Sequence, residues 1–255
     1  MCLLFLTLWL GLIAAYQLPA PYLAKPPLSY GHYCNDSDPY WWDGFLYVDL
    51  WGTLDVADNC VIRVKQFDSI EVHDDARLEA KPEAQVLLQS WNHLTLYADT
   101  VLSNSSSLTL TTHSALEVKT GLTLGVNAVF EIARFSWAIA EGGLKVGYGS
   151  KVIVSDFSKL VIGYRGNLSL NEHAGLAVQE FSSLIIGPNA GLKIEQDSSL
   201  SISRHAVLEI TNDTWIRIRG NAVVHENSQL VLTSKDANSG RAYGFEHLEQ
   251  ADFGK

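Results

Sequence analysis

The sequence predicts an all-β fold, a three-sided β-solenoid of about eight coils with ~24 residues in each coil. An eight-residue phrase returns almost unchanged between Phe157 and Ile218, and its apolar residues alternate with residues that must point the other way. Such alternation is typical of short β-strands, and no 3.6-residue period survives across two phrases. A strand of three or four residues cannot bury its apolar face alone, so neighbouring strands must stack on it.

The length of one coil follows from a longer repeat. The segment "FSKLVIG" at Phe157 returns as "FSSLIIG" at Phe181, an offset of three phrases. This offset favours three strands in each coil, so that equivalent residues of every third phrase lie above one another. A rival offset of two phrases, between "DSSLSI" at Asp197 and "DTWIRI" at Asp213, favours a two-sided coil. The first match is longer and includes a bulky residue, and we therefore predict three sides.

The repeat runs through residues 46–233, so one continuous solenoid domain is predicted. The first apolar position of each phrase recurs every eight residues, apart from three steps of six residues that shorten a corner and leave the strands in phase. The shortened steps follow Leu102, Leu116 and Ala138. Polar residues such as Asn189 open the phrases, tolerate left-handed backbone and are expected at the corners.

This coil length and strand alternation resemble the right-handed parallel β-helix (pectin-lyase-like) superfamily over residues 46–233. The resemblance concerns architecture and implies a single-stranded parallel β-helix. The superfamily includes adhesin passengers and enzymes that cleave acidic polysaccharides, usually with Asp clusters, Ca2+ and a basic residue in a groove. The chain lacks the enzymes' Gly-His-Gly, and "TND" at Thr211 and "RIR" at Arg217 differ from their Asn-Thr-Asp and Arg-Ile-Lys.

Two groups of residues are candidates for chemistry in a β-helix enzyme. Asp74 and Asp75 are adjacent carboxylates, although a corner also accounts for them. His173, Asp197 and Asn221 are spaced by three phrases and would form a polar ladder for a cation or a sugar hydroxyl, unless each merely occupies a corner. The sequence contains no HExxH, GxSxG, CxxC or phosphate-cradling Gly loop, and we expect no metal and no cofactor.

The first 45 residues differ in composition and indicate export. Residues 1–20 read as a secretory signal peptide, although the missing early Lys or Arg leaves a retained anchor as an alternative. Residues 21–45 begin as a Pro-rich linker and continue as an aromatic segment that we expect to cap the first coil. Residues 234–255 lose the repeat and form a polar C-terminal tail, either a weakly ordered end or the point where a longer solenoid protein was shortened. No run after the signal peptide is apolar enough to cross a membrane.

Cysteine usage and sequons agree with a secreted, extracellular glycoprotein. Cys34 and Cys60 are the two cysteines outside the predicted signal peptide, and an oxidising compartment would join them in a disulfide that pins the cap to the first coil. The alternative is two unrelated buried thiols. Four N-x-S/T sequons are candidate N-glycosylation sites. They are at Asn35, Asn104, Asn167 and Asn212.

Two rows of outward side chains are predicted from the coil of three phrases. A mildly basic row suits an acidic glycan, although charges on an exposed sheet are also simply solubilising. It contains Thr123, Lys145, Ser169, Lys193 and Arg217. An apolar row suits contact with another chain or with a folded-back tail, unless an extra loop lies over it. It contains Ile139, Val161 and Ile185.

These features predict a secreted, non-catalytic β-solenoid glycoprotein with a structural, adhesive or carbohydrate-contacting surface. The expected partners are an extracellular glycan or another protein chain. The formal net charge of −10 argues against nucleic acid, because phosphate binding needs clustered Lys and Arg. The alternative is a carbohydrate-active enzyme of the β-helix type, a polysaccharide lyase or glycoside hydrolase, although the predicted corners are too short to wall a groove.

Overall fold

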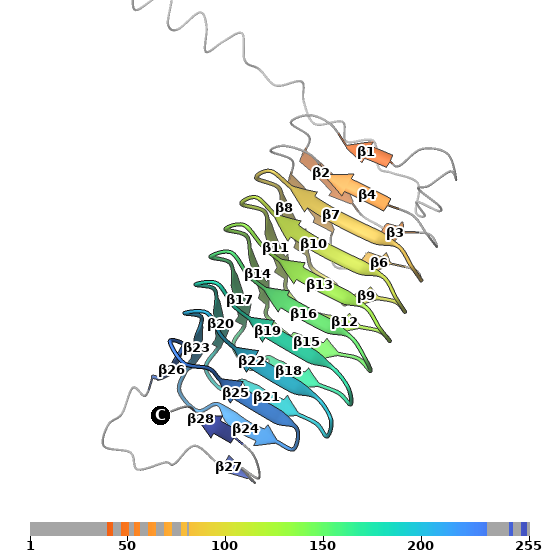
Figure 1. Ribbon diagram of the computed structural model, residues 1–255. Coiled ribbons are helices and arrows are strands. Elements are labelled where there is room, and N and C mark those ends of the chain that lie inside the picture. Colours follow the sequence, from red (N-terminus) through yellow and green to blue (C-terminus); the bar gives the residue numbers. More distant parts are fainter. Residues whose placement is uncertain are drawn as a thin grey trace, which may run out of the picture.

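The chain forms an all-β solenoid of three parallel sheets, seen in a computed structural model whose coils stack along one axis (Figure 1). Residues 78–80 and 82–233 are described in full, and outside them the structure describes only the short strands given below. The chain visits the three sheets in turn, and each strand pairs in parallel with the strand of the next coil. The fully described part, from residue 78 to residue 233, has about seven turns, and the predicted fold class is confirmed.

Each side of the solenoid is one continuous sheet. The first sheet contains, in spatial order, β1 (Tyr40–Trp42), β4 (Val61–Val64), β7 (Gln85–Gln89), β10 (Ser107–Thr111), β13 (Val129–Ile132), β16 (Lys151–Val154), β19 (Gly175–Val178), β22 (Ser199–Ile202), β25 (Asn221–Val224) and β28 (Ala251–Phe253). The second sheet contains β2 (Tyr47–Leu50), β5 (Ser69–Val72), β8 (His93–Leu96), β11 (Ala115–Val118), β14 (Trp137–Ala140), β17 (Lys159–Ile162), β20 (Ser183–Ile186), β23 (Val207–Ile210) and β26 (Gln229–Leu232). The third sheet contains β3 (Leu54–Val56), β6 (Leu78–Ala80), β9 (Thr100–Leu102), β12 (Gly121–Leu124), β15 (Gly143–Val146), β18 (Asn167–Leu170), β21 (Gly191–Ile194), β24 (Trp215–Ile218) and β27 (Phe245–Glu246).

Alternation explains why these short segments become strands. In most of the described strands the second and fourth residues are buried and the first and third face outward, as β18 illustrates. Leu144, Leu168 and Leu192 lie opposite one another in neighbouring strands and are fully buried. Each such side chain stabilises the fold by about 2 kcal/mol, so the stack of aliphatic residues holds the coils together.

Coil length is not uniform, and this corrects part of the predicted spacing. Ser158 and Ser182 occupy equivalent positions of successive coils and are 24 residues apart, whereas the equivalent Ser114 and Ser136 are 22 residues apart. Most of the shorter coils have two residues instead of four at the corner between the second and third sheets. Residues 119–120, for example, connect β11 to β12, whereas residues 163–166 connect β17 to β18.

Two of the three predicted shortenings are present in the structure at their predicted places, after Leu116 and after Ala138. The third falls before Thr100 rather than after Leu102, because Thr100 is the buried inward residue that pairs with Leu122. A fourth shortening makes Ala222, opposite Leu200, the first inward residue of β25 in place of Val224. In both places the true inward residue is small or polar, Thr100 or Ala222, and a larger aliphatic residue, Leu102 or Val224, follows two positions later.

The solenoid extends beyond the predicted bounds of 46–233. Strand β1 lies within the predicted cap and pairs with β4, and strands β27 and β28 lie within the predicted tail and pair with β24 and β25. The predicted signal peptide, the Cys34 and Cys60 pair, Asn35, Asp74 and Asp75 all lie outside the described residues. In the part of the chain that is described, no helix is long and apolar enough to cross a membrane.

Candidate interaction surface

The corner between the first and second sheets has the same backbone conformation in six consecutive coils. Each corner contains two successive residues with positive φ, for example Asp156 at 54° and Phe157 at 61°. The left-handed region is unfavourable for an aromatic residue by roughly 1 kcal/mol. The second residue of each pair nevertheless carries a ring. These residues, which we call the ring ladder, are Trp91, His113, Phe135, Phe157, Phe181 and His205.

The rings of the ladder stack on one another along the corner. Successive ring centroids from Trp91 to His205 are 4.2, 5.2, 5.2, 5.1 and 4.9 Å apart, and no pair of planes is inclined by more than 16°. The backbone supports this spacing, because the N–H of Phe157 donates to the carbonyl of Glu180 at 3.0 Å and neighbouring coils repeat the bond. Each stacked pair contributes about 0.5–1.5 kcal/mol, which offsets the left-handed strain.

The ladder presents ring edges, rather than ring faces, to solvent. Phe135, Phe157 and Phe181 are 54, 57 and 58% exposed, although each of them has a ring stacked on both of its faces. A sugar packs best on an aromatic face, and the interior rungs of the ladder have no free face to offer. The exposed surface is therefore a ribbon of C–H edges that fits apolar protein side chains better than sugar rings.

A row of buried polar residues lies behind the ladder. The backbone N–H groups of Ser114, Ser136 and Ser158 donate to the Oγ atoms of Ser136, Ser158 and Ser182 at 3.1, 3.2 and 3.1 Å. These serines are at most 2% exposed, so each hydroxyl satisfies an amide that water does not reach. The hydrogen bonds connect successive coils and fix the position of each ring.

The predicted apolar row lies on the second sheet, separated from the ring ladder by the first outward residue of each strand, Trp137, Lys159 or Ser183. Ile139 pairs with Val161 and Val161 pairs with Ile185, so the three side chains are aligned and half-buried on the outer face. The same three coils carry Phe135, Phe157 and Phe181 at the adjoining corner. We call these six residues the apolar patch. A role of this patch in binding stays a prediction.

Charged residues of the neighbouring strands and of the corner border the apolar patch. Glu117 lies opposite Ile139 on one side, and Glu209 lies opposite Ile185 on the other. At the corner, Arg204 forms an ion pair with Glu180. An apolar centre with a charged rim is the usual anatomy of a protein interface.

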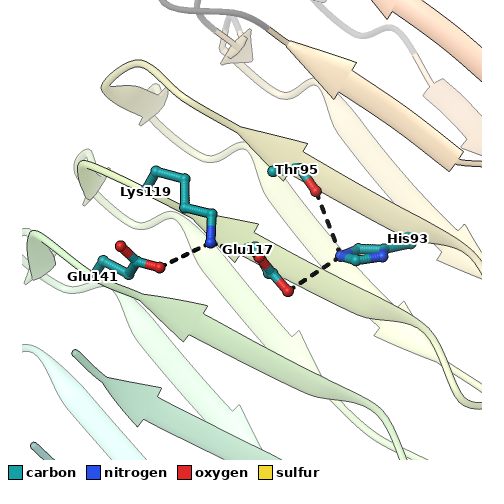
Figure 2. Close-up of polar contacts among 5 residues, drawn as sticks. All are labelled: His93, Thr95, Glu117, Lys119 and Glu141. Atoms are coloured by element: carbon teal, nitrogen blue, oxygen red, sulfur yellow. Dashed lines mark hydrogen bonds and ion pairs between the residues drawn. The ribbon is translucent and has the colours of Figure 1, made fainter.

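Figure 2 shows a polar network on the second sheet beside the patch. His93 Nε2 lies 3.4 Å from Thr95 Oγ1 and 3.5 Å from Glu117 Oε1. Lys119 Nζ lies 2.8 Å from Glu117 Oε2 and 2.9 Å from Glu141 Oε1. Hydrogen bonds to these two carboxylates raise the pKa of Lys119 above its ordinary value, so its ammonium group stays charged.

Sequence analysis did not identify this network, although Lys119 and Glu141 are 22 residues apart, the spacing that the predicted shortening after Leu116 gives to successive coils. The side chains contact one another, and the His93 ring also meets the indole of Trp137 edge-on, with centroids 5.7 Å apart. Chemically, the arrangement is a set of paired side chains in which two carboxylates share one ammonium group.

The predicted basic row is aligned on the third sheet as the repeat requires. Register places Thr123, Lys145, Ser169, Lys193 and Arg217 opposite one another in successive strands. Its charge is reduced, because Lys193 forms an ion pair with Glu195, and Nη1 of Arg219 lies 3.7 Å from the same carboxylate. Binding of an acidic glycan to this row stays a prediction.

The predicted polar ladder is only partly formed. His173 and Asp197 both occupy left-handed corners, with φ of 58° and 57°. Asn221 instead pairs with Ser199 in a strand, because this coil is two residues shorter than three phrases, so the inclusion of Asn221 was wrong. In residues 78–80 and 82–233, no group of three or more His, Cys, Asp or Glu side chains is placed to hold a metal ion.

Three predicted glycosylation sites lie in the described part of the chain. Asn104 and Asn167 are exposed, and Asn212 is half-buried. Oδ1 of Asn104 accepts a hydrogen bond from the N–H of Val126 at 3.1 Å. The occupancy of these sequons stays a prediction.

The ring ladder also lay outside the sequence prediction, although the sequence contains a signal for it. Two residues before each second-sheet strand from β8 to β23 there is an aromatic residue or His. Phe45 and Phe67 occupy the same sequence position before β2 and β5.

Comparisons of the chain with models of protein families, with curated proteins and with solved structures find no match.

Proposed function

We propose that the chain is a secreted, non-catalytic β-solenoid glycoprotein that acts as a structural or adhesive element through its outer surface. The apolar patch is the observation that carries the proposal. It combines three Phe rings, each more than half exposed, with an aligned row of half-buried aliphatic residues in the same coils. Exposed apolar side chains that are repeated on neighbouring coils are typical of a contact site.

The partner that fits the patch best is a second copy of the same solenoid. Strands of any parallel sheet repeat at about 4.8 Å, so another solenoid presents side chains with the same rung spacing as the patch. The rim also carries charges of both signs, because Arg134, Asp156, Glu180 and Arg204 precede the rings at four successive corners. In an interface between copies, Arg134 of one copy complements Asp156 of the other, whereas Arg204 is already paired with Glu180.

Sedimentation velocity of the secreted protein over a range of about 1–100 μM tests the proposal, since transient interfaces have dissociation constants in this range. We expect a dimer or a larger assembly for the wild type and a monomer for the double variant Phe157→Asn, Phe181→Gly. Asn and Gly both accept left-handed backbone, so the corners are retained. Gly at position 181 avoids a new N-x-S sequon with Ser182 and Ser183. His173→Asn removes an exposed ring at another left-handed corner and should leave the assembly intact.

A wild-type protein that stays monomeric at the highest concentration would exclude self-association. If both the double variant and His173→Asn still assemble, the contact between copies lies outside the apolar patch. Retention of the chain inside expressing cells, with unmodified sequons, would contradict the secreted part of the proposal.

An acidic glycan on the basic row is a second candidate partner, supported by the alignment of Lys145, Lys193 and Arg217 on one face. Charge reversal at Lys193 and Arg217 should then abolish binding to acidic glycans such as heparin. Binding that survives this change would dispose of the row as a glycan site.

The alternative function, a carbohydrate-active enzyme, rests on the polar network of Figure 2. It places two carboxylates, Glu117 and Glu141, on either side of the cationic Lys119, with His93 beside Glu117. The same contacts engage the groups with one another, which favours a structural role. Incubation with acidic polysaccharides, with and without Ca2+, separates the two functions, because new reducing or unsaturated ends appear only with an enzyme.

A further inference from the structure

Three neighbouring strands of the third sheet bring a sequon, a glycine and a tryptophan into one column. Asn167 in β18 pairs with Gly191 in β21, and Gly191 pairs with Trp215 in β24. The three residues face outward from the sheet. Asn167, Leu168 and Ser169 form an N-x-S sequon.

The side chains of Asn167 and Trp215 converge above Gly191. A Cβ atom at Gly191 would overlap Cε2 and Cζ2 of Trp215 and would lie 2.5 Å from Oδ1 of Asn167. The indole therefore rests on the bare backbone of Gly191, and the carboxamide of Asn167 leans towards the same point from the next coil. Trp215 is 43% exposed, so much of its indole surface is left open to solvent beside the Asn167 amide.

We propose that an N-linked glycan on Asn167 packs its first N-acetylglucosamine against the indole of Trp215, with Gly191 as the floor of the site. Sugar rings carry an apolar C–H face, and aromatic side chains with one polar end and an apolar body are suited to such contact. The site rests on the proposed function, because the glycan is attached only if the chain enters the secretory pathway.

The other described sequons lack this arrangement. Asn104 lies at a corner, and its carboxamide oxygen is engaged by the backbone N–H of Val126. Asn212 also lies at a corner and is half-buried, and its carbonyl accepts the N–H of Asn189 at 3.0 Å. Asn167 is the described sequon with an exposed indole in the same column of the sheet.

The test begins with protein secreted from eukaryotic cells that make only high-mannose glycans, and with peptide mass spectrometry of each sequon. Endoglycosidase H trims the glycans of one portion to a single N-acetylglucosamine, and peptide N-glycosidase F removes the whole glycan from a second, untrimmed portion. We expect trimming to leave the unfolding temperature unchanged and complete removal to lower it by about 2–4 °C, as one lost contact does in a protein of this size.

Variants of Trp215 and Gly191 test whether contact of the sugar with the indole causes this shift in unfolding temperature. In Trp215→Ala, complete removal of the glycan should shift the unfolding temperature by less than about 1 °C, and Trp215→Tyr should restore most of the wild-type shift. Gly191→Ala should displace the indole and reduce the shift even though Trp215 is retained. Asn104→Gln should leave the shift unchanged, and Asn167→Asp controls for the charge that the enzyme leaves behind.

An unoccupied Asn167 in secreted protein with sugar on Asn104 would overturn this inference and leave the proposed function intact. An equal shift in Trp215→Ala and wild-type protein would also overturn it. If the chain is not secreted and no sequon is modified, the proposed function itself fails.

Discussion

Phe157 and Phe181, one coil apart, stack with ring centroids 5.1 Å apart and planes only 5° from parallel, although both side chains are more than half exposed. Both residues also have left-handed backbone, which by itself disfavours an aromatic side chain. Stacking between coils compensates for this local strain. The ladder is therefore a property of the assembled solenoid and does not arise in a single coil.

We expect Phe157→Asn to lower the free energy of unfolding by about 1 kcal/mol. The change removes two stacked pairs, a loss of about 1–3 kcal/mol in total, and it relieves left-handed strain of about 1 kcal/mol. Urea denaturation followed by circular dichroism measures the difference.

Glu83→Asn is the matched control, because Glu83 is exposed at a left-handed corner, with φ of 61°. This variant should be as stable as the wild type or slightly more stable. If Phe157→Asn behaved in the same way, stacking would contribute nothing measurable.

Ser158→Ala should lower the free energy of unfolding by about 1–3 kcal/mol, because it leaves the buried N–H of Ser136 without its acceptor. Ser199→Ala, at an exposed outward position, should change stability by less than about 0.5 kcal/mol. Equal effects of the two substitutions in chemical denaturation would mean that the buried serine row does not stabilise the corners.

Lys119→Met should destabilise the protein by about 1 kcal/mol near pH 8, because Glu117 and Glu141 lose the cation that they share. The folded state raises the pKa of Lys119, so its stabilisation is complete below the ordinary Lys value of about 10.4. It is lost as the pH rises through the higher folded-state pKa.

The difference between wild-type protein and Lys119→Met should therefore persist from pH 8 to about pH 10 and shrink only above that value. Thermal unfolding at a series of pH values gives the comparison. A difference that vanished below pH 9 would contradict the assigned role of the ammonium group.

Thr100→Val should leave stability unchanged or raise it slightly. Thr100 is fully buried in the aliphatic core, and its hydroxyl donates only a long hydrogen bond of 3.5 Å to the carbonyl of Ala98. Val has a similar shape, removes a poorly satisfied polar group and adds apolar contact. A loss of more than about 1 kcal/mol in urea denaturation would mean that the hydroxyl has a better partner than the structure indicates.

Much of the fold could be predicted because inward residues alternate with outward ones along every strand. Leu184 and Ile186, for example, are buried on either side of the half-buried Ile185. The three-sided coil followed from Phe157 and Phe181, which do lie directly next to each other in the ladder. The apolar and basic rows could be placed correctly because the shortening after Ala138 was predicted. Ile139 and Val161 are 22 residues apart, as are Thr123 and Lys145, whereas the later members of both rows are 24 residues apart.

One site error depends on a shortening that was not predicted. Ala222, rather than Val224, is the first inward residue of β25, so Asn221 lies in a strand and not in the polar ladder. The pairing of Lys119 with Glu141 was not identified, although the shortening that allows it was predicted after Leu116. The ring ladder was missed for a different reason. A run of exposed aromatic residues at left-handed corners contradicts the usual preference for Gly and Asn there, and only contacts between coils explain it.

The corners between the second and third sheets also determine which changes of chain length the protein tolerates. Two-residue and four-residue connections occur at the same place, in β11 to β12 and in β17 to β18, and the strands on either side keep their inward and outward faces. Insertion or loss of a residue pair at such a corner preserves the alternation, whereas a single residue would turn the next strand inside out. Lineages of this protein should therefore vary in length at that corner by even numbers of residues.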